Sequence, residues 1–170
     1  GVACYPARFQ LVLAANPCPC APPNSRDCVC PSADRRRYLG KLSGPLMDRV
    51  DLRVDMHPVL AGAFGDHAAE STSAVRARVA AARAAAAERW QDVGVRTNAE
   101  VPGPVLRRKF RLSRDAMKPL RKSLDSGRLS IRGVDRTLRV AWSLADLAGR
   151  DSPNLEDVST ALGFREGELR

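Results

Sequence analysis

The segment SIRGVDRTLRVAWSLADLAG, residues 130–149, decides the fold of the second half of the chain. Ser130 can cap a helix, because its hydroxyl oxygen accepts a hydrogen bond from a free N–H group of the first turn. Gly149 can end that helix. Between them, apolar side chains recur at helical spacing: Val134, Leu138, Ala141, Leu144, Ala145 and Ala148. Because such a stripe is buried against other helices, the segment predicts a helical domain.

Flanking segments predict further helices. The helices expected besides residues 131–148 span residues 33–41, 71–90, 102–110, 113–124 and 154–162. Ser71 can cap the second of these, and Gly94 closes it. Trp90 and Trp142 are expected to pack in a core rather than to stack on nucleic-acid bases.

The first part of the chain has a different pattern. Residues 9–15 form a continuous apolar run that stops at Asn16-Pro17, which predicts a buried strand of a parallel sheet. Residues 49–54 alternate apolar and charged side chains, which predicts a half-buried strand near a sheet edge. Residues 17–32 predict a loop rich in Pro and Cys. Two strands alone do not form a stable sheet, so we expect them to belong to a larger one.

The predicted fold class is therefore mostly α, with a division near residue 65. Residues 1–65 are expected to be the C-terminal part of an α/β core with a Cys-rich insertion at residues 17–32. Residues 66–170 are expected to form an all-helical domain of roughly 100 residues, a usual size for one compact unit.

The charge of the chain favours polyanionic partners. Lys and Arg exceed Asp and Glu by 9, and the pI is about 10.0. Such an excess attracts nucleic acid, but an Arg-rich surface can also be merely solvated. Residues 35–37 are a run of three arginines that fits either interpretation. No apolar run is long enough to cross a bilayer and no signal peptide is visible, so we expect a cytoplasmic protein without membrane contact.

Four of the five cysteines are clustered. Cys18, Cys20, Cys28 and Cys30 form two C-x-C pairs, whereas Cys4 stands apart. Four thiolates have the number and softness for tetrahedral Zn²⁺, although zinc fingers usually space their cysteines further apart. The alternative is four reduced thiols in a loop. An odd total without a secretion signal argues against a disulfide framework.

These motifs together resemble a known family. The motifs are residues 9–20 with Cys28 and Cys30, Arg37-Tyr38, residues 42–52, Ser130-Ile131-Arg132, residues 138–141 and residues 144–149. They resemble the C-terminal part of magnesium-chelatase-like AAA+ ATPases of the ComM (YifB) branch. The resemblance implies the end of the ATPase core, the arginine finger and a helical lid.

The sequence also departs from the family pattern. The P-loop, G-x-x-x-x-G-K-[ST], is absent, and so is a strand ending in Asp-Glu that would hold Mg²⁺. We expect both upstream in the intact protein. We therefore expect the 170-residue chain alone not to hydrolyse ATP.

The resemblance implies roles for individual residues. Asn16 would be the sensor-1 residue at the end of a strand, although an Asn before a Pro can simply start a turn. Arg49 would be the arginine finger that reaches a neighbouring subunit's nucleotide, and the alternative is a surface pair with Asp48 or Asp51. Arg132 would be sensor 2, with Arg139 as the competing candidate and Arg136 on a solvated face.

The resemblance also implies a function. We expect the intact protein to bind ATP and Mg²⁺ between the subunits of a homo-oligomeric ring, a hexamer, and to remodel or branch-migrate DNA. One alternative is a magnesium-chelatase subunit, which would insert Mg²⁺ into a porphyrin. Another is a non-enzymatic, zinc-dependent DNA-binding module.

Overall fold

The computed structural model describes residues 3–4, 9–22, 27–56 and 70–166. By its internal contacts the chain divides into a first unit within residues 1–43 and a second unit within residues 44–169. The division expected near residue 65 lies outside the described residues.

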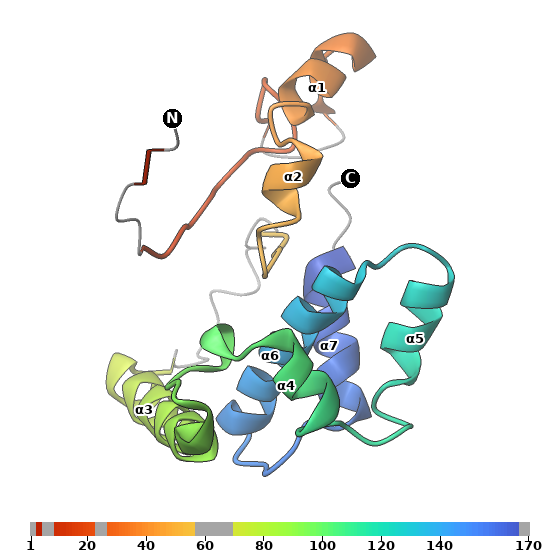
Figure 1. Ribbon diagram of the computed structural model, residues 1–170. Helices are drawn as coiled ribbons and strands as arrows, with labels where there is room; N and C mark the ends of the chain where they lie inside the picture. Colours follow the sequence, from red (N-terminus) through yellow and green to blue (C-terminus); the bar gives the residue numbers. More distant parts are fainter. Residues whose placement is uncertain (1–2, 5–8, 23–26, 57–69, 167–170) are drawn as a thin grey trace. The chain divides into compact units, whose positions relative to one another are not determined.

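Helices make up the regular structure of the described residues, which confirms the mostly α fold class (Figure 1). The α-helices are α1 (Ser32–Leu39), α2 (Gly44–Met47), α3 (Thr72–Arg89), α4 (Gly103–Arg108), α5 (Lys118–Asp125), α6 (Ile131–Leu147) and α7 (Leu155–Glu166). Two 3₁₀ turns, η3 (Gln91–Val93) and η4 (Asn98–Glu100), lie between α3 and α4. Among the described residues, no helix is long and apolar enough to cross a membrane.

Helix α6 is the centre of the second unit. It packs against α7, α3, α4, α5 and η4. Its N-terminus has the predicted cap, since the Ser130 hydroxyl accepts a hydrogen bond from the Gly133 N–H group at 3.1 Å. Its buried side chains include Val134, Leu138 and Ala141, all members of the predicted stripe. The stripe therefore predicted most of the core, but Leu144 is only partly buried and Ala148 is exposed.

Aromatic side chains fill the space between α3, α4 and α6. The ring of Trp90 lies 4.5 Å from that of Phe110 and 5.4 Å from that of Trp142, centroid to centroid, in edge-on geometry. Trp90 is fully buried and Trp142 is 4% exposed. Both tryptophans belong to the core, as expected from the sequence, and edge-on pairs of this kind stabilise a core beyond their buried area.

A buried polar network ties η4 and α3 to α6. The Trp90 indole N–H group donates to Asn98 Oδ1 at 2.7 Å, and the Asn98 amide donates to Asp146 Oδ2 at 2.8 Å. Arg89 pairs with the same carboxylate and lies over the Trp142 ring, 4.3 Å from its centroid. The buried charge of Asp146 is thus both paired and hydrogen-bonded, as a buried charge must be.

Two helix starts differ from the sequence-based expectation. Gly44-Pro45 interrupts the basic helix but also begins α2, because a proline in the first turn needs no N–H acceptor. Helix α5 begins at Lys118 rather than near residue 113, with Pro119 in its first turn. Before it, the Ser113 hydroxyl accepts from the Ala116 N–H group in a separate turn.

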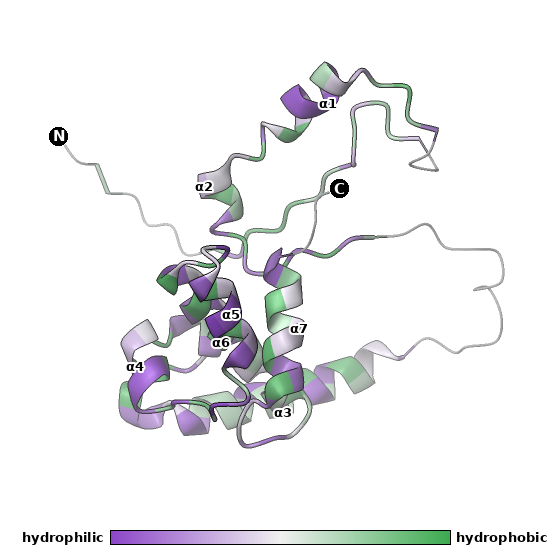
Figure 2. Cartoon of the chain, turned by 90° about the vertical axis from the view of Figure 1, so that its right-hand side faces the viewer, coloured by the Kyte–Doolittle hydropathy of each residue, from purple (hydrophilic) through white to green (hydrophobic). Residues whose placement is uncertain are grey.

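The strand predicted at residues 9–15 is wrong, because the structure has no strand there. The segment is extended and belongs to no sheet (Figure 2). Its apolar side chains are exposed, and Val12 is 80% exposed. The apolar composition of the run predicts a buried strand, yet a strand is stable only when a neighbouring strand accepts and donates its hydrogen bonds. No such neighbour lies among the described residues, so the run keeps its strand-like composition without a sheet.

Residues 49–54 were also wrongly predicted as a strand. Leu52 and Val54, expected on the buried face, are 52% and 62% exposed. Instead of a sheet ladder, the segment makes one backbone hydrogen bond to α7, from the Arg53 N–H group to the Phe164 carbonyl at 2.8 Å. The charged residues of the segment contact helices instead, since Asp51 pairs with Arg136 of α6.

Candidate metal centre and arginine positions

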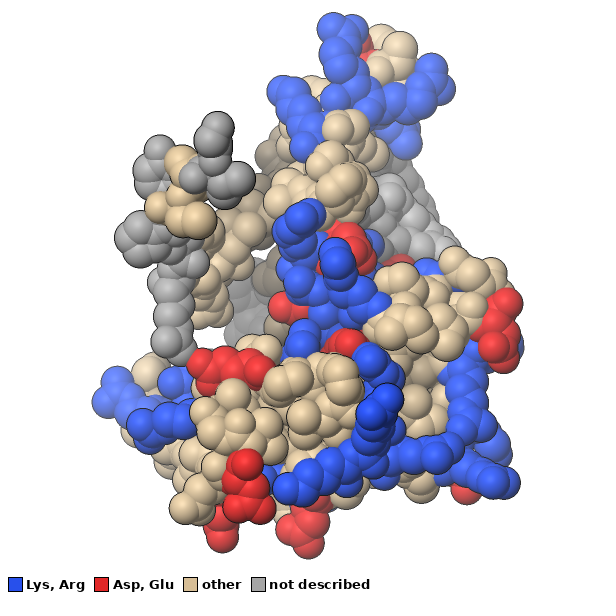
Figure 3. All heavy atoms as spheres, in the orientation of Figure 1, with Lys and Arg blue, Asp and Glu red and all other residues tan. Residues whose placement is uncertain are grey.

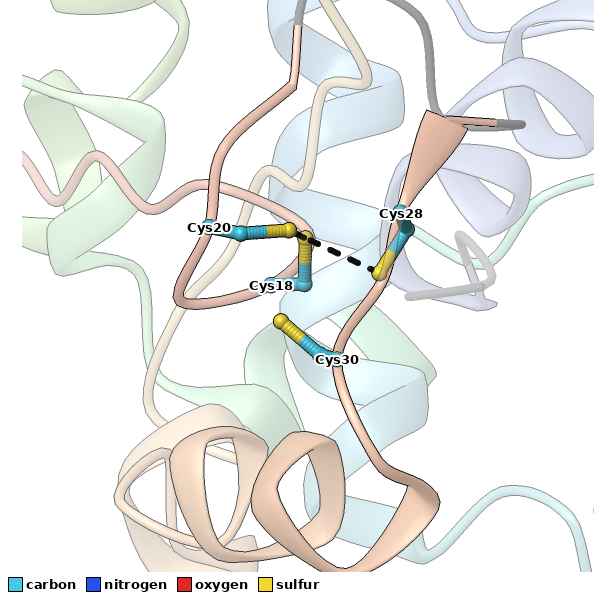
Figure 4. Close-up of side chains that lie close together, drawn as sticks. All are labelled: Cys18, Cys20, Cys28 and Cys30. Carbon is cyan, nitrogen blue, oxygen red and sulfur yellow. Dashed lines mark hydrogen bonds between the residues drawn. The ribbon is translucent and has the colours of Figure 1, made fainter.

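The four clustered cysteines lie together in the first unit, as Figure 4 shows. The Sγ atoms of Cys18, Cys20, Cys28 and Cys30 all lie within 4.8 Å of one another. The Cys18 and Cys20 sulfurs are 3.4 Å apart, and the Cys20 and Cys28 sulfurs are 3.8 Å apart. All four thiols are free, since these distances far exceed the roughly 2.05 Å of a disulfide.

The local backbone explains why each C-x-C pair can supply two ligands. Around the first pair the chain makes a tight turn, in which the Ala21 N–H group donates to the Cys18 carbonyl at 3.3 Å. Pro19 occupies the second position of this turn, where its fixed φ is favourable. The second pair lies in an irregular, non-helical stretch, with Val29 between its cysteines 85% exposed. In an extended backbone, residues two apart lie on the same side.

The thiols perturb one another. Hydrogen bonds from Cys30 and then Cys18 lower the pKa of the Cys20 thiol to about 7. The same contact with Cys20, together with burial, raises the pKa of Cys30 to about 12. Burial and the Cys20 contact raise the pKa of Cys18.

The geometry fits a tetrahedral zinc ion. A Zn–S bond of about 2.3 Å places the four sulfurs of a tetrahedron roughly 3.8 Å apart. The two sulfur distances given above, 3.4 and 3.8 Å, lie close to that value. Among the described residues this is the one group of cysteine, histidine and acidic side chains placed to hold a metal ion. The cluster can therefore bind a metal through sulfur alone.

Asn16 lies at the end of the extended segment of the first unit, next to the cysteine turn. Its side chain is exposed. Because the segment belongs to no sheet, the structure gives Asn16 no strand terminus to occupy. Its sensor-1 role stays a prediction.

Arg49 follows α2 in the second unit, with an exposed side chain. Its guanidinium donates to the Pro45 carbonyl at 2.6 Å, across the end of the short helix. The acids on either side pair with other arginines: Asp48 with Arg165, and Asp51 with Arg136. Asp48 and Asp51, the alternative partners considered for Arg49, are thus paired with other arginines.

Sequence reasoning missed the residues that hold the Arg49 segment. Arg136 of α6 donates to the Arg49 carbonyl at 2.8 Å and to Asp51 at 2.6 Å, so it is not a merely solvated side chain. Arg165 of α7 is only 8% exposed and pairs with Asp48. Helical spacing alone could have placed Arg136 one turn after Arg132, but no local signal pairs it with a segment 87 residues away.

The two candidates for sensor 2 have different surroundings. Arg139 is half-buried, and its guanidinium donates twice to the Val101 carbonyl, at 3.0 and 2.9 Å. Arg132 lies exposed in the first turn of α6, and no hydrogen bond or ion pair of its side chain occurs within the described part of the chain. Arg139 is therefore engaged in holding the loop before α4, whereas Arg132 is available to a ligand.

Two family matches cover nearly the whole chain. Residues 1–63 match the family described as magnesium chelatase, subunit ChlI. Residues 69–165 match the family described as magnesium chelatase, subunit ChlI C-terminal.

Individual relatives agree with these matches. The uncharacterized protein Rv2897c of Mycobacterium tuberculosis is 72% identical over all 170 residues. The uncharacterized protein YifB of Escherichia coli is 34% identical over 95% of the chain, and the competence protein ComM of Haemophilus influenzae is 32% identical over 95%. The chain spans 34% of the length of the first protein and 31% of each of the other two. The resemblance found in the sequence is confirmed.

Proposed function

The chain belongs to the magnesium chelatase subunit ChlI family, and from this premise we propose that it is the C-terminal part of a Mg-ATP-dependent AAA+ ring motor that remodels or branch-migrates DNA. The observation that carries the proposal is the similarity to a relative named a competence protein, ComM, over 95% of the chain. The excess of 9 positive charges suits a polyanionic substrate.

In this proposal Arg49 acts on a neighbouring subunit. Its side chain is exposed, and its flanking acids are neutralised by Arg136 and Arg165, so they do not compete for the guanidinium. A guanidinium remains charged and binds phosphate oxygens as a fork, which suits a residue that reaches across a subunit boundary. Such a residue requires a neighbouring subunit, which a homo-oligomeric ring, a hexamer, would supply.

The two remaining predicted roles belong to Asn16 and to Arg132 of the helical lid. Asn16 would orient the attacking water, and Arg132 would contact a phosphate from the start of α6, where the helix N-terminus already favours an anion. ATP and Mg²⁺ would be held mainly by the part of the intact protein that carries the P-loop. The work would take place in the cytoplasm, where thiols stay reduced.

The family name makes a magnesium-chelatase subunit the second candidate, since both matching families are described by that activity. The four clustered cysteines favour the motor, because the Cys-rich insertion resembles the ComM branch. Hydrolysis that responds to branched DNA but not to a porphyrin would separate the two. DNA binding with no hydrolysis at all in the intact protein would favour a non-enzymatic zinc module.

A mixing experiment tests the role of Arg49. In a protein that joins this chain to the P-loop half, Arg49→Ala should leave ATP binding nearly unchanged and slow hydrolysis by about 10³-fold or more. Arg121→Ala, an exposed arginine of α5, is the matched control. Mixed rings of Arg49→Ala subunits and P-loop-lysine variants should regain activity, because one intact finger can serve one intact P-loop. Mixed rings that form and stay inactive would refute action in trans.

A further inference from the structure

Helix α1 lacks the support that keeps short helices folded. It has eight residues, none of them buried, and no side chain caps its N-terminus. An isolated helix of this length is marginal in water, because too few hydrogen bonds offset the cost of nucleation. Of the described residues of the first unit, Cys18 alone is buried. No apolar core therefore explains why α1 is folded.

The cysteine cluster lies directly before α1. Cys30 is two residues ahead of Ser32, and Pro31 links them with φ of −55°, a value that suits the residue before a helix. The Asp34 and Arg35 N–H groups donate to the Pro31 carbonyl at 3.0 and 3.1 Å, which closes the first turn. A metal ion that fixed Cys30 would therefore also fix the start of α1.

The exposed surface of α1 is basic. Arg35, Arg36 and Arg37 are exposed, and Lys41 follows the helix. One acid opposes them: Asp34 pairs with Arg37 at 2.9 Å on the surface, a contact worth little. In Figure 3 the blue side chains gather around the end of the view that α1 occupies. The exposed arginines give α1 the charge to bind phosphates.

We propose that Zn²⁺ at the four thiols folds α1, and that the folded helix binds the phosphate backbone of duplex DNA through Arg35 and Arg36. Zinc binding displaces the four thiol protons and joins two segments of the loop, so its free energy becomes folding free energy for the adjoining helix. The choice of DNA as the polyanion rests on the proposed function. ATP hydrolysis is not required.

The metal half of the proposal is tested on the full 170-residue chain. With one bound Zn²⁺, trypsin should cut slowly after Arg35, Arg36 and Arg37; chelation should speed those cuts at least tenfold. Cys28→Ser with Cys30→Ser should lose both the zinc and the protection. Cys4→Ser, which alters the cysteine outside the cluster, should keep both. Equal cleavage rates with and without zinc would overturn the coupling.

The binding half is tested with a fluorescent 20-base-pair duplex and anisotropy at several salt concentrations. Arg35→Ala with Arg36→Ala should weaken binding by roughly tenfold and reduce the slope of log affinity against log salt by about two. The matched control is Arg76→Ala with Arg83→Ala, which removes the same charge from exposed positions of α3. An equal loss in both variants would mean diffuse charge attraction and would overturn the assignment to α1.

Measuring DNA binding with and without a chelator tests the metal half and the binding half of the proposal together. Chelation should weaken DNA binding of the parent chain about as much as the α1 substitutions do, and should add little to the substituted variant, because both remove the same contact. Chelation that leaves DNA affinity unchanged would refute the proposal. A loss of hydrolysis or remodelling activity in the intact protein would instead concern the proposed function, since none of these measurements uses ATP.

Discussion

The two units of the chain are stabilised by different chemistry. In the second unit, α6 buries an apolar stripe against its neighbours, and the Trp90–Trp142–Phe110 cluster fills the remaining space. In the described residues of the first unit, one side chain is buried, and it is the thiol of Cys18. Hydrophobic burial is available to the second unit from its own sequence, whereas we propose that the first is stabilised by a metal ion bound to its thiols.

The difference explains where the candidate functional residues lie. The second unit offers a rigid support, so Arg49 can be exposed and still be held by contacts to α2 and α6. In the first unit, the basic residues of α1 have no comparable support. In our proposal, a packed core holds the phosphate-binding side chain of the second unit, and a coordinated metal would hold those of the first.

The largest expected effect comes from removing the metal. A structural zinc site contributes about 10 kcal/mol or more to the folding of the segment that it joins. Chelation should therefore bring the backbone amides of α1 to the hydrogen-exchange rates of an unfolded chain, while those of α6 remain protected. The measurement is hydrogen exchange read by mass spectrometry on both units at once. Loss of protection in α6 as well would contradict the separation of the two units.

A substitution in the core of the second unit should destabilise that unit and leave the first unit unchanged. Trp90→Ala removes a fully buried ring and its hydrogen bond to Asn98, and should destabilise the second unit by about 3–5 kcal/mol. The urea midpoint of helix loss measures this. Zinc stoichiometry should not change. Trp90→Phe is the control, since it keeps much of the ring volume and should cost less; a fall in zinc content in either variant would show that the units fold together.

The fold of the second unit was predictable because helices are locally determined. Ser130 and Ser71 cap the helices that the sequence assigned to them, and the Val134–Ala145 stripe became the core. Helical hydrogen bonds join residues four apart, so a window of sequence contains both partners. The strands expected at residues 9–15 and 49–54 failed for the converse reason, because the partners of a strand lie elsewhere.

The candidate sites, too, were predictable only where the signal lies in a short stretch of sequence. The two C-x-C pairs correctly indicated a cluster of four sulfurs, since residue type and spacing are local. The contacts of Arg136 with Arg49 and Asp51, and of Arg165 with Asp48, join positions 85 or more residues apart, and no pattern in either segment identifies the other. The same contacts can test whether the second unit begins at Gly44 or near residue 65.

Shortening the chain tests that boundary with a moderate expected effect. Residues 44–170 retain Asp48 beside Arg165, whereas residues 70–170 lack it and also lose the Arg53–Phe164 hydrogen bond. Hydrogen bonds to charged groups contribute about 1.5–3 kcal/mol each, so the shorter piece should be less stable by roughly that amount. Asp48→Ala in the longer piece should reproduce part of the loss. Equal urea midpoints for the two pieces would favour the boundary expected near residue 65.

The smallest expected effect concerns the start of α3, where the second unit resumes after the residues that the structure leaves undescribed. Glu70 pairs with Arg78, whose hydrogen bonds lower the pKa of the Glu70 carboxyl below its ordinary value of 4.5. Since the folded carboxylate binds its proton less tightly than the unfolded one, the pair stabilises α3 above pH 4.5 and this contribution disappears as the pH falls through the lower folded pKa.

Backbone amide chemical shifts of Ala74 and Val75, followed from pH 6 to pH 3, should therefore show an acid step in the parent chain that is absent in Glu70→Gln. Glu88→Gln, at an exposed position near the other end of α3, should retain the step. Both groups are exposed, so salt should weaken the pair and reduce the step. A step that persists in Glu70→Gln would mean that another carboxylate, rather than this ion pair, governs the pH response of the first turns of α3.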